Sequence, residues 1–310
     1  MIFSHYSVLL DECIDGLNIK PDGTYVDCTA GGGGHSAKIL DKLSDDGLLI
    51  CIDKDEDALE VCRQRLKKGN VKFVHSDFKR LPQILDSLGI DGVDGILCDL
   101  GVSSYQIDNP ERGFSYMAAD APLDMRMDAT QQLTAREIVN TYGERQLFDI
   151  ILDYGEESFA KMIAKNIVVE RQKHSIDTCG QLVEIIDKSI PYSARKKGSH
   201  PAKRTFQALR IEVNKELDGL DGFIGSAADL LNPNGRLAVI TFHSLEDRIV
   251  KHSFNDLATD CVCPPNLPIC VCNHRAKGSL VNKKPILPTE KELQVNSRSQ
   301  SAKLRIFEKK

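Results

Sequence analysis

The sequence predicts an α/β protein whose mostly parallel sheet carries helices on both faces and is interrupted by an inserted helical domain. Two observations indicate the sheet: short β-rich apolar runs alternate with stretches of helical spacing from the start of the chain to Asp99, and one more such run begins at Arg236. A third observation indicates the insert. The gap between Asp99 and Arg236 is much longer than a usual crossover between neighbouring strands.

The expected strands and helices follow from local spacing. Runs rich in β-branched and apolar residues predict five strands, at residues 25–28, 48–52, 71–74, 95–98 and 237–242. Apolar residues three and four apart predict helices at 35–43 and 56–66. Because a helix follows each of the first strands, we expect those strands to pair in parallel.

The long gap is itself mostly helical by pattern. Helices are expected at residues 135–142, 146–152, 158–171 and 181–189, with Thr134 and Asp177 as N-caps. We therefore expect a small helical domain growing out of the carboxyl edge of the sheet. The expected limits are 1–106 for the first part of the core, 107–205 for the insert and 206–310 for the second part with a basic tail.

Composition excludes several classes of protein. The chain has 40 Lys and Arg against 45 Asp and Glu, a formal charge of -5, so it has no globally basic coat. No apolar run approaches the roughly 18 residues of a membrane span, and residues 1–10 lack the pattern of an export signal. We expect a soluble, cytoplasmic protein without a membrane partner. The oligomeric state stays open, and a homodimer is one possibility.

A glycine-rich turn is the first candidate binding feature. Residues 25–36 run from a strand through four glycines into a helix, YVDCTAGGGGHS. Glycines let the backbone turn sharply and approach a ligand, and Asp53 at the end of the next strand suits the hydroxyls of a ribose. A dinucleotide-binding turn has a third glycine at the position of Ser36 and binds a pyrophosphate at the start of the helix. S-adenosylmethionine is the alternative ligand, and it has no phosphate. A merely structural turn is the third alternative.

The next two strand ends add further polar groups. The third strand leads to Asp77 and Phe78, which suit an adenine by hydrogen bond and stacking, although a Phe is more commonly part of a core. The fourth leads to Asp99. Because ligands lie beyond the carboxyl ends of parallel strands, we expect Asp99 in the same crevice as Gly33 and Asp53.

Four longer motifs resemble a known family. The motifs are DLGVSS at 99–104, ERGFSYM at 111–117 with PLDMRMD at 122–128, HPAKRTFQALR at 200–210 and TFHSLEDR at 241–248. In this order they resemble the bacterial ribosomal small-subunit RNA cytosine-N4 methyltransferases, the RsmH/MraW family. Other amino-methyltransferases carry Pro-Pro and an aromatic after the acidic residue. Here Leu100 and Gly101 follow Asp99, so Tyr105 is the nearest ring for stacking on a base.

The resemblance implies a fold, a reaction and a set of contacts. It implies a class I (Rossmann-like) S-adenosylmethionine-dependent methyltransferase sheet with an inserted helical domain. It implies methyl transfer to the N4 of a decoding-site cytidine, position 1402 of 16S ribosomal RNA, in the small ribosomal subunit. The cofactor contacts carried over are Gly33, Gly34, His35, Asp53, Phe78, Asp99 and Gln106.

Asp99 is the candidate catalytic residue. The N4 lone pair of cytosine is delocalised into the ring, so an acceptor must orient an N–H while the methyl transfers, and Asp99 can do this. Holding the reacting atoms in line at about 3 to 3.5 Å then supplies most of the rate, without a metal or covalent intermediate. An equally open reading is that Asp99 only binds cofactor. The dinucleotide-dependent oxidoreductase, a DNA or small-molecule amino-methyltransferase and a non-catalytic RNA-binding module are the alternative functions.

Basic stretches predict where RNA binds. Residues 188–211 contain seven Lys or Arg and no acidic residue, including Arg195, Lys196 and Lys197. Such a run can bind phosphates and position RNA without reading its sequence, although a solvated surface would look the same. The expected substrate-side residues are Ser103, Lys203, Arg204, Arg210 and His243.

The ten cysteines divide into two groups. Cys13, Cys28, Cys51, Cys62, Cys98 and Cys179 are scattered and are expected to be reduced core thiols. Cys261, Cys263, Cys270 and Cys272 lie within twelve residues, with His274 close by. This group can hold a tetrahedral zinc, but reduced loop thiols and a redox-labile pair are open alternatives.

Overall fold

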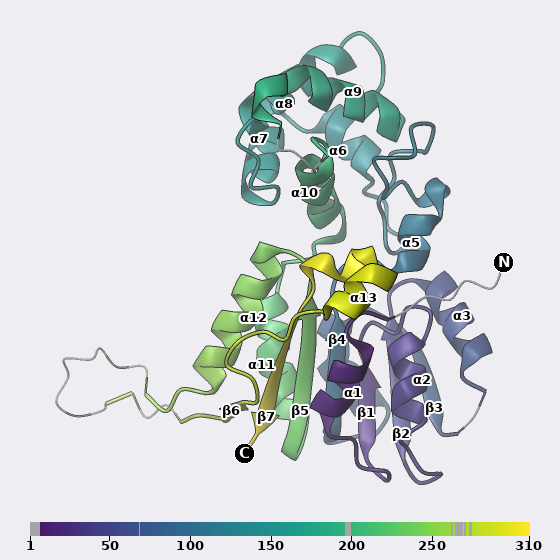
Figure 1. Ribbon diagram of the computed structural model, residues 1–310, viewed down its shortest axis with the longest axis vertical. Coiled ribbons are helices and arrows are strands. Elements are labelled where there is room, and N and C mark those ends of the chain that lie inside the picture. Colours follow the sequence, from purple (N-terminus) through teal and green to yellow (C-terminus); the bar gives the residue numbers. More distant parts are fainter. Residues whose placement is uncertain are drawn as a thin grey trace. The chain divides into compact units, whose positions relative to one another are not determined.

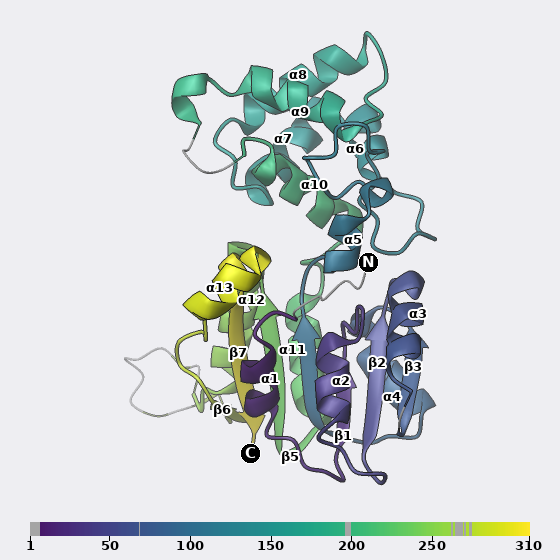
Figure 2. The same ribbon diagram turned by 45° about the vertical axis from the view of Figure 1, so that its right-hand side comes forward.

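A computed structural model of the chain (Figures 1 and 2) describes residues 7–67, 69–195, 200–261, 263, 269, 271–272 and 275–310. The chain forms two units. The sheet unit comprises Met1–Gly101 and Gly219–Lys310, and the helical unit comprises Val102–Asp218. The helical unit is therefore inserted into the sequence of the sheet unit.

The sheet unit is built on one sheet. Its strands in the described residues are β1 (Thr24–Asp27), β2 (Leu48–Asp53), β3 (Val71–His75), β4 (Val93–Asp99), β5 (Leu231–Thr241), β6 (Gly278–Leu280) and β7 (Lys303–Lys309). They lie in the order β3-β2-β1-β4-β5-β7-β6, and β1 to β5 pair in parallel. All five predicted strands are confirmed. Direct pairing of β4 with β5 confirms that the insert separates two neighbouring strands.

The last strand was not predicted. β7 pairs antiparallel with both β5 and β6, and Figure 1 shows it between them. Its apolar pattern is interrupted by the buried Arg305, whose Nε donates to Oδ1 of Asp247 at 2.7 Å. That partner is 58 residues away in sequence, so local spacing could not reveal that the arginine belongs inside.

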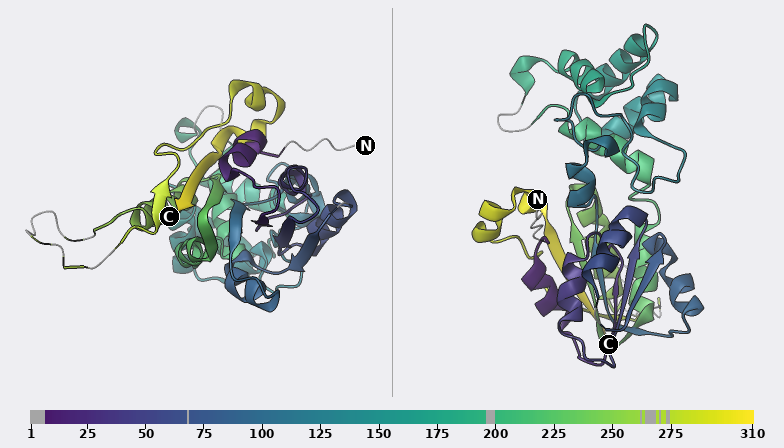
Figure 3. Two further views of the ribbon diagram at one scale, coloured as in Figure 1. Left: turned by 90° about the horizontal axis from the view of Figure 1, so that it is seen from below. Right: turned by 90° about the vertical axis from the view of Figure 1, so that its right-hand side faces the viewer.

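Helices cover both faces of the sheet, as predicted (Figure 3). On one face the helix residues Leu85, Phe223 and Phe254 join a buried core, and on the other the helix residues Leu17 and Leu59 join a second core. Neighbouring strand residues alternate between these cores because strand side chains point to opposite faces. The helices and 3-10 turns of this unit are α1 (Leu10–Leu17), α2 (Gly34–Leu40), α3 (Glu56–Arg65), η1 (Phe78–Arg80), α4 (Leu81–Ser87), α11 (Leu220–Leu230), α12 (Ser244–Leu257), α13 (Glu290–Val295) and η4 (Ser297–Ser301).

The helical unit has its own apolar core, which includes Ile138, Leu147, Ile163, Leu182 and Phe206. Its elements are α5 (Ser104–Asp108), η2 (Pro110–Arg112), α6 (Ala135–Thr141), α7 (Glu144–Asp153), α8 (Ala160–Arg171), α9 (Cys179–Ser189), η3 (Tyr192–Ala194) and α10 (Lys203–Asn214). All four predicted helices are present. None of the helices described in either unit is long and apolar enough to cross a membrane.

One of the two predicted caps is confirmed. Thr134 caps α6, since its Oγ1 accepts the Glu137 N–H at 3.1 Å. Asp177 was a wrong prediction: Thr178 is the N-cap of α9, and its Oγ1 accepts the Gln181 N–H. Asp177 instead accepts from Arg136 Nε at 2.6 Å, a partner that only the tertiary structure brings close.

The helical unit is longer than the expected insert, 107–205, at both ends. The difference at its carboxyl end has a packing reason, because Phe206, Leu209 and Val213 of α10 bury their side chains in the helical core. Asn214 at the end of α10 also accepts the Met127 N–H at 2.8 Å and donates to the Met125 carbonyl at 2.8 Å. These contacts bind α10 to the helical unit.

Candidate functional site

The site is built at the carboxyl ends of β1, β2, β4 and β5, which share one edge of the sheet because these strands are parallel. β1 ends at the buried Asp27. Its Oδ2 accepts the Ser36 hydroxyl at 2.6 Å and its Oδ1 accepts the Thr29 N–H at 3.2 Å. Burial raises the pKa of Asp27 to about 6. Ser36, where a dinucleotide loop would have glycine, thus ties α2 to β1.

The glycine turn is closely packed against its neighbours. Gly33 has a φ of +75°, and a Cβ there would lie 2.9 Å from Cys62 Sγ. A Cβ at Gly34 would overlap the Ser7 hydroxyl. The positive φ favours glycine at Gly33, and at both positions the absence of a Cβ allows the close approach of Cys62 of α3 and of Ser7.

Asp53 at the end of β2 holds the glycine turn in place. Its Oδ2 accepts the Gly31 N–H at 2.8 Å and its Oδ1 accepts the Asp55 N–H at 2.9 Å. Burial raises the pKa of Asp53 to about 6. Each carboxylate oxygen has a second lone pair, so bracing the turn leaves acceptor capacity for a ligand hydroxyl.

Asp99 at the end of β4 lies beside the turn. Its backbone N–H donates to Thr29 Oγ1 at 2.6 Å, and its Oδ2 is 3.7 Å from His35 Nδ1. Among the described residues, its buried Oδ1 has no hydrogen-bond partner. Burial, together with the nearby carboxyls of Asp27 and Glu246, raises the pKa of Asp99 well above its ordinary value. A buried acceptor without a partner is unfavourable in a folded protein and indicates a ligand position.

His35 faces Asp99 as a neutral ring. Its Nε2 lies 2.9 Å from the Val8 carbonyl, and burial lowers the pKa of His35 to about 4. Since a carbonyl only accepts, Nε2 carries the proton and Nδ1 presents a lone pair toward Asp99. The ring therefore does not neutralise the Asp99 carboxyl.

Phe78 and Asp77 have contacts within the sheet unit. The Phe78 ring packs edge-on against Phe223, with 4.7 Å between centroids, and joins the core beside α11. Asp77 caps η1 by accepting the Lys79 N–H at 2.9 Å. These contacts support the alternative in which Phe78 is part of the core. Stacking of Phe78 on an adenine stays a prediction.

The end of β5 contributes a carboxylate that sequence reasoning missed. His243 is the N-cap of α12, and its Nε2 lies 3.1 Å from Oε1 of the buried Glu246. Glu246 Oε2 accepts the Phe242 N–H at 2.9 Å. The spacing of Glu246 three residues after the cap is the signature of a capping box, and that signal could have placed Glu246 in the first turn of a helix, although it does not predict burial.

The remaining predicted residues belong to the helical unit. Ser103 and Gln106 form the capping box of α5: Ser103 Oγ accepts the Gln106 N–H at 3.2 Å, and Gln106 Oε1 accepts the Ser103 N–H at 3.0 Å. Arg210 makes a two-pronged ion pair with Glu216, at 2.8 Å for each contact. Lys203 is exposed.

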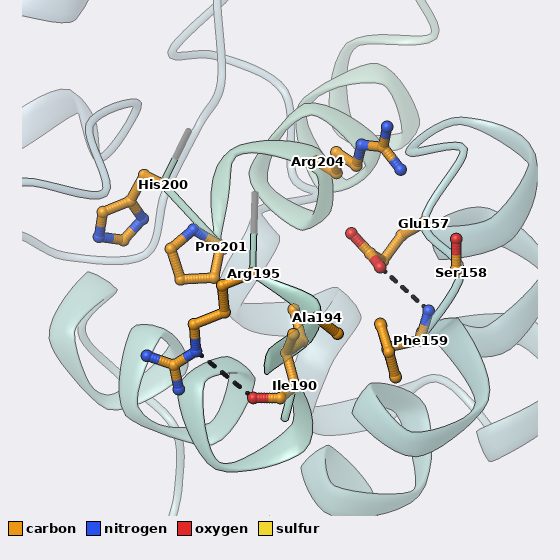
Figure 4. A pocket seen from close by; sticks show the side chains of 9 residues that line it. All are labelled: Glu157, Ser158, Phe159, Ile190, Ala194, Arg195, His200, Pro201 and Arg204. Atoms are coloured by element: carbon orange, nitrogen blue, oxygen red, sulfur yellow. Dashed lines mark hydrogen bonds between the residues drawn. The ribbon is translucent and has the colours of Figure 1, made fainter. Parts of the chain in front are cut away.

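A small pocket of the helical unit gathers parts of the basic stretch (Figure 4). It is lined by Glu157, Ser158, Phe159, Ile190, Ala194, Arg195, His200, Pro201 and Arg204. Arg204 donates to the Glu156 carbonyl at 2.7 Å, and Arg195 donates to the Asp187 carbonyl at 2.7 Å. Lys196 and Lys197 lie outside the described residues. The pocket therefore presents two guanidinium groups that the protein already orients.

The comparisons with known proteins match the whole chain. The family model described as "MraW methylase family" matches residues 2–310. This chain belongs to the MraW methylase family. It is 57% identical over 311 residues to ribosomal RNA small subunit methyltransferase H 2 of Agathobacter rectalis, covering 100% of this chain and 99% of the relative. It is 55% identical to ribosomal RNA small subunit methyltransferase H of Clostridioides difficile, covering 100% of both.

A solved structure of a putative rRNA-methylase from Clostridium thermocellum is also similar. It has a TM-score of 0.41 and 14% identity, with 99% of this chain and 100% of that chain covered.

Within the MraW methylase chain, the predicted residues fall into two sets. Gly33, Gly34, His35, Asp53 and Asp99 come together at the strand ends of the sheet unit. His243 also belongs to the sheet unit, and Ser103, Gln106, Lys203, Arg204 and Arg210 belong to the helical unit.

Proposed function

We propose that this MraW-family methylase transfers the methyl group of S-adenosylmethionine to the exocyclic N4 of a decoding-site cytidine in 16S ribosomal RNA. One observation carries the proposal: in a chain that matches a methylase family from end to end, a buried carboxyl oxygen without a hydrogen-bond partner, Asp99 Oδ1, lies beside a glycine turn at the strand ends. The curated relatives named above are ribosomal RNA small subunit methyltransferases, which supports RNA as the substrate.

The charges of the site fit a cationic cofactor. Asp27, Asp53, Asp99 and Glu246 lie at the same strand ends, and burial raises the pKa of the first three. When bound, S-adenosylmethionine supplies an electrophilic methyl on a positively charged sulfur, and buried carboxylates stabilise such a charge. The same carboxylates would repel the pyrophosphate of a dinucleotide. This repulsion disfavours the dinucleotide-dependent oxidoreductase alternative. Ser36 also disfavours it, because a dinucleotide loop would have glycine there, whereas the Ser36 hydroxyl donates a hydrogen bond to Asp27.

Residues of this chain have distinct tasks in the reaction. Gly31 and Asp53 form the part of the cofactor site that faces the ribose of S-adenosylmethionine. The Asp53 oxygens retain lone pairs that can accept hydrogen bonds from the ribose hydroxyls. Asp99 Oδ1 accepts an N–H of the cytosine amine and holds the nitrogen in line with the methyl. Because His35 is neutral, it forms no ion pair with Asp99, and the Asp99 carboxyl remains available to the ligand.

The helical unit supplies groups suited to RNA. Lys203 is exposed, and Arg195 and Arg204 line one pocket. A base that undergoes chemistry must be unpaired or turned out of its stack, and contacts to phosphate then position the strand. We propose that the small ribosomal subunit presents the cytidine in this form, which places the reaction in the cytoplasm.

Mass mapping of ribosomal RNA tests the proposal. Small subunits from cells lacking the protein are incubated with it and S-adenosylmethionine, and the decoding-site fragment is digested to nucleosides. We expect one added methyl group, on cytidine N4, and none when the cofactor is omitted. Methylation of DNA only would favour another amino-methyltransferase. Binding of subunits without any methyl transfer would favour the RNA-binding module.

A further inference from the structure

The segment that joins α12 to β6 contains a cluster of thiols that the proposed methyl transfer does not use. The structure describes Cys261, Cys263 and Cys272 in this segment, while Cys270 and His274 lie outside the described residues. The base of the segment is closed by two contacts: the Lys277 N–H donates to the Leu257 carbonyl at 2.8 Å, and the Ala276 N–H donates to Asp260 Oδ1 at 3.1 Å. The thiols are therefore carried on a loop whose two ends are fixed to each other.

The three sulfur atoms lie close together. Their Sγ atoms are all within 4.8 Å of one another, and the Sγ atoms of Cys261 and Cys272 are 3.8 Å apart. Thiolates bound to one tetrahedral zinc at about 2.3 Å have sulfur atoms about 3.8 Å apart, so the measured separation fits a shared ion.

A backbone contact supports the thiolate form. The Val271 N–H lies 3.5 Å from Cys263 Sγ and points its hydrogen toward the sulfur. A donor of this kind stabilises negative charge on sulfur, in the same way that second-shell groups stabilise metal ligands. The three thiols are also at least partly exposed, unlike the six scattered cysteines, which are all buried. Burial raises the pKa of Cys13 and Cys98 well above the ordinary value, which disfavours metal binding by those core thiols.

We propose that Cys261, Cys263 and Cys272 bind one zinc ion, which cross-links the loop between α12 and β6. Each thiol releases its proton to water as its sulfur bonds to the ion, and no electron is transferred. The role of the ion is structural, because no part of the methyl-transfer site lies among these residues. The proposal is independent of the proposed function and can fail while methyl transfer is intact.

Elemental analysis and cobalt substitution test the site. The full chain, with no metal-binding tag, is purified under a reducing agent without chelators. We expect about one zinc per chain, and after exchange with cobalt we expect intense near-ultraviolet bands from sulfur-to-cobalt charge transfer. Cys261→Ser, Cys263→Ser and Cys272→Ser should each lose most of the zinc and weaken the bands. Cys179→Ala, which removes a buried thiol of the helical unit, is the matched control and should keep both.

Two results would overturn the proposal. One is a reduced, folded protein that holds neither zinc nor cobalt. The other is an intact mass lower by two hydrogen atoms without any bound metal, which would assign these cysteines to a disulfide. Because a variant can also lose zinc by unfolding, circular dichroism accompanies each measurement, and zinc loss from a variant with the native spectrum supports the proposal.

Discussion

Asp99 has one carboxyl oxygen near His35 and one buried oxygen that no described group satisfies. Asp99→Asn preserves the size of the side chain but removes the negative charge that accepts the N4 hydrogen. We expect methyl transfer to fall by about 100-fold or more, the range for loss of one well-placed catalytic group. Labelled-methyl transfer to small subunits measures the rate, and calorimetry measures cofactor affinity.

The control for Asp99→Asn is Asp41→Asn, which changes an exposed carboxylate of the same unit and should leave the rate unchanged. Near-normal turnover in Asp99→Asn with the cofactor bound would remove the orienting role and leave Asp99 a part of the cofactor site only.

The raised pKa of Asp99 predicts a pH effect on cofactor choice. A positive sulfur beside Asp99 favours the ionised carboxyl, so binding of S-adenosylmethionine releases a proton from it. The affinity for S-adenosylmethionine should therefore rise with pH until Asp99 is ionised in the free protein as well. S-adenosylhomocysteine has no charge on sulfur and should show a weaker rise. Calorimetric titrations at several pH values measure both, and parallel curves for the two ligands would contradict the expectation.

At the scale of elements, the charges of α10 have different roles. Lys203 at its start is exposed, whereas Arg210 is committed to the buried Glu216. Lys203→Ala should therefore weaken the salt dependence of RNA binding. The slope of the logarithm of the binding constant against the logarithm of the salt concentration should become shallower by about 0.7 to 0.9, which is the contribution of one phosphate contact. Binding titrations of small subunits at several salt concentrations provide the slope.

Arg210→Ala is the matched comparison on the same helix. It should leave the salt slope unchanged and lower the free energy of unfolding by about 1–3 kcal/mol, because Glu216 loses its charged partner. Urea denaturation gives the free energy. If Arg210→Ala changed the slope as much as Lys203→Ala, Arg210 would contact phosphate after all and the ion pair would open on binding.

Elements differed in how well they could be predicted from sequence. β1 to β4 and α3 were predicted to within a few residues, because each carries its periodicity within its own sequence. The expected limits of the insert, 107–205, differ from those of the helical unit, Val102–Asp218, at the carboxyl end because α10 is amphipathic and its spacing does not say which core it joins. The burial of Glu246 was also not predicted. Burial of an acidic side chain depends on partners such as the Phe242 N–H, and composition alone assigns an acidic residue to the surface.

At the scale of the whole molecule, the buried Asp27 carboxyl of the site makes the free energy of unfolding depend on pH. The pKa of Asp27 is about 6 in the folded chain against an ordinary value of 3.8, so the folded state holds this proton more tightly than the unfolded state. The resulting stabilisation is fully present below pH 3.8 and is lost as pH rises through about 6. At pH 8 the buried carboxylate thus lowers stability relative to a neutral group of the same shape.

Asp27→Asn should relieve this effect. We expect the variant to gain up to about 3 kcal/mol of unfolding free energy over the parent at pH 8, from about two pKa units, and to gain little near pH 4. Urea denaturation at both pH values measures the difference. A gain that is the same at both pH values would mean that packing rather than ionisation is responsible.

The sequence by itself determined the alternation of strands and helices, the insert between two neighbouring strands and the gathering of Gly33, Asp53 and Asp99 at one edge. It could do so because parallel strands must end on the same side of a sheet, so residues at their ends meet wherever the strands are. Only the tertiary structure decided which side chains are already engaged: Arg210 by Glu216, Phe78 by Phe223 and the Asp53 oxygens by backbone N–H groups. These pairings are made through space between separately formed elements, and the availability of a charge or a ring for a ligand depends on them.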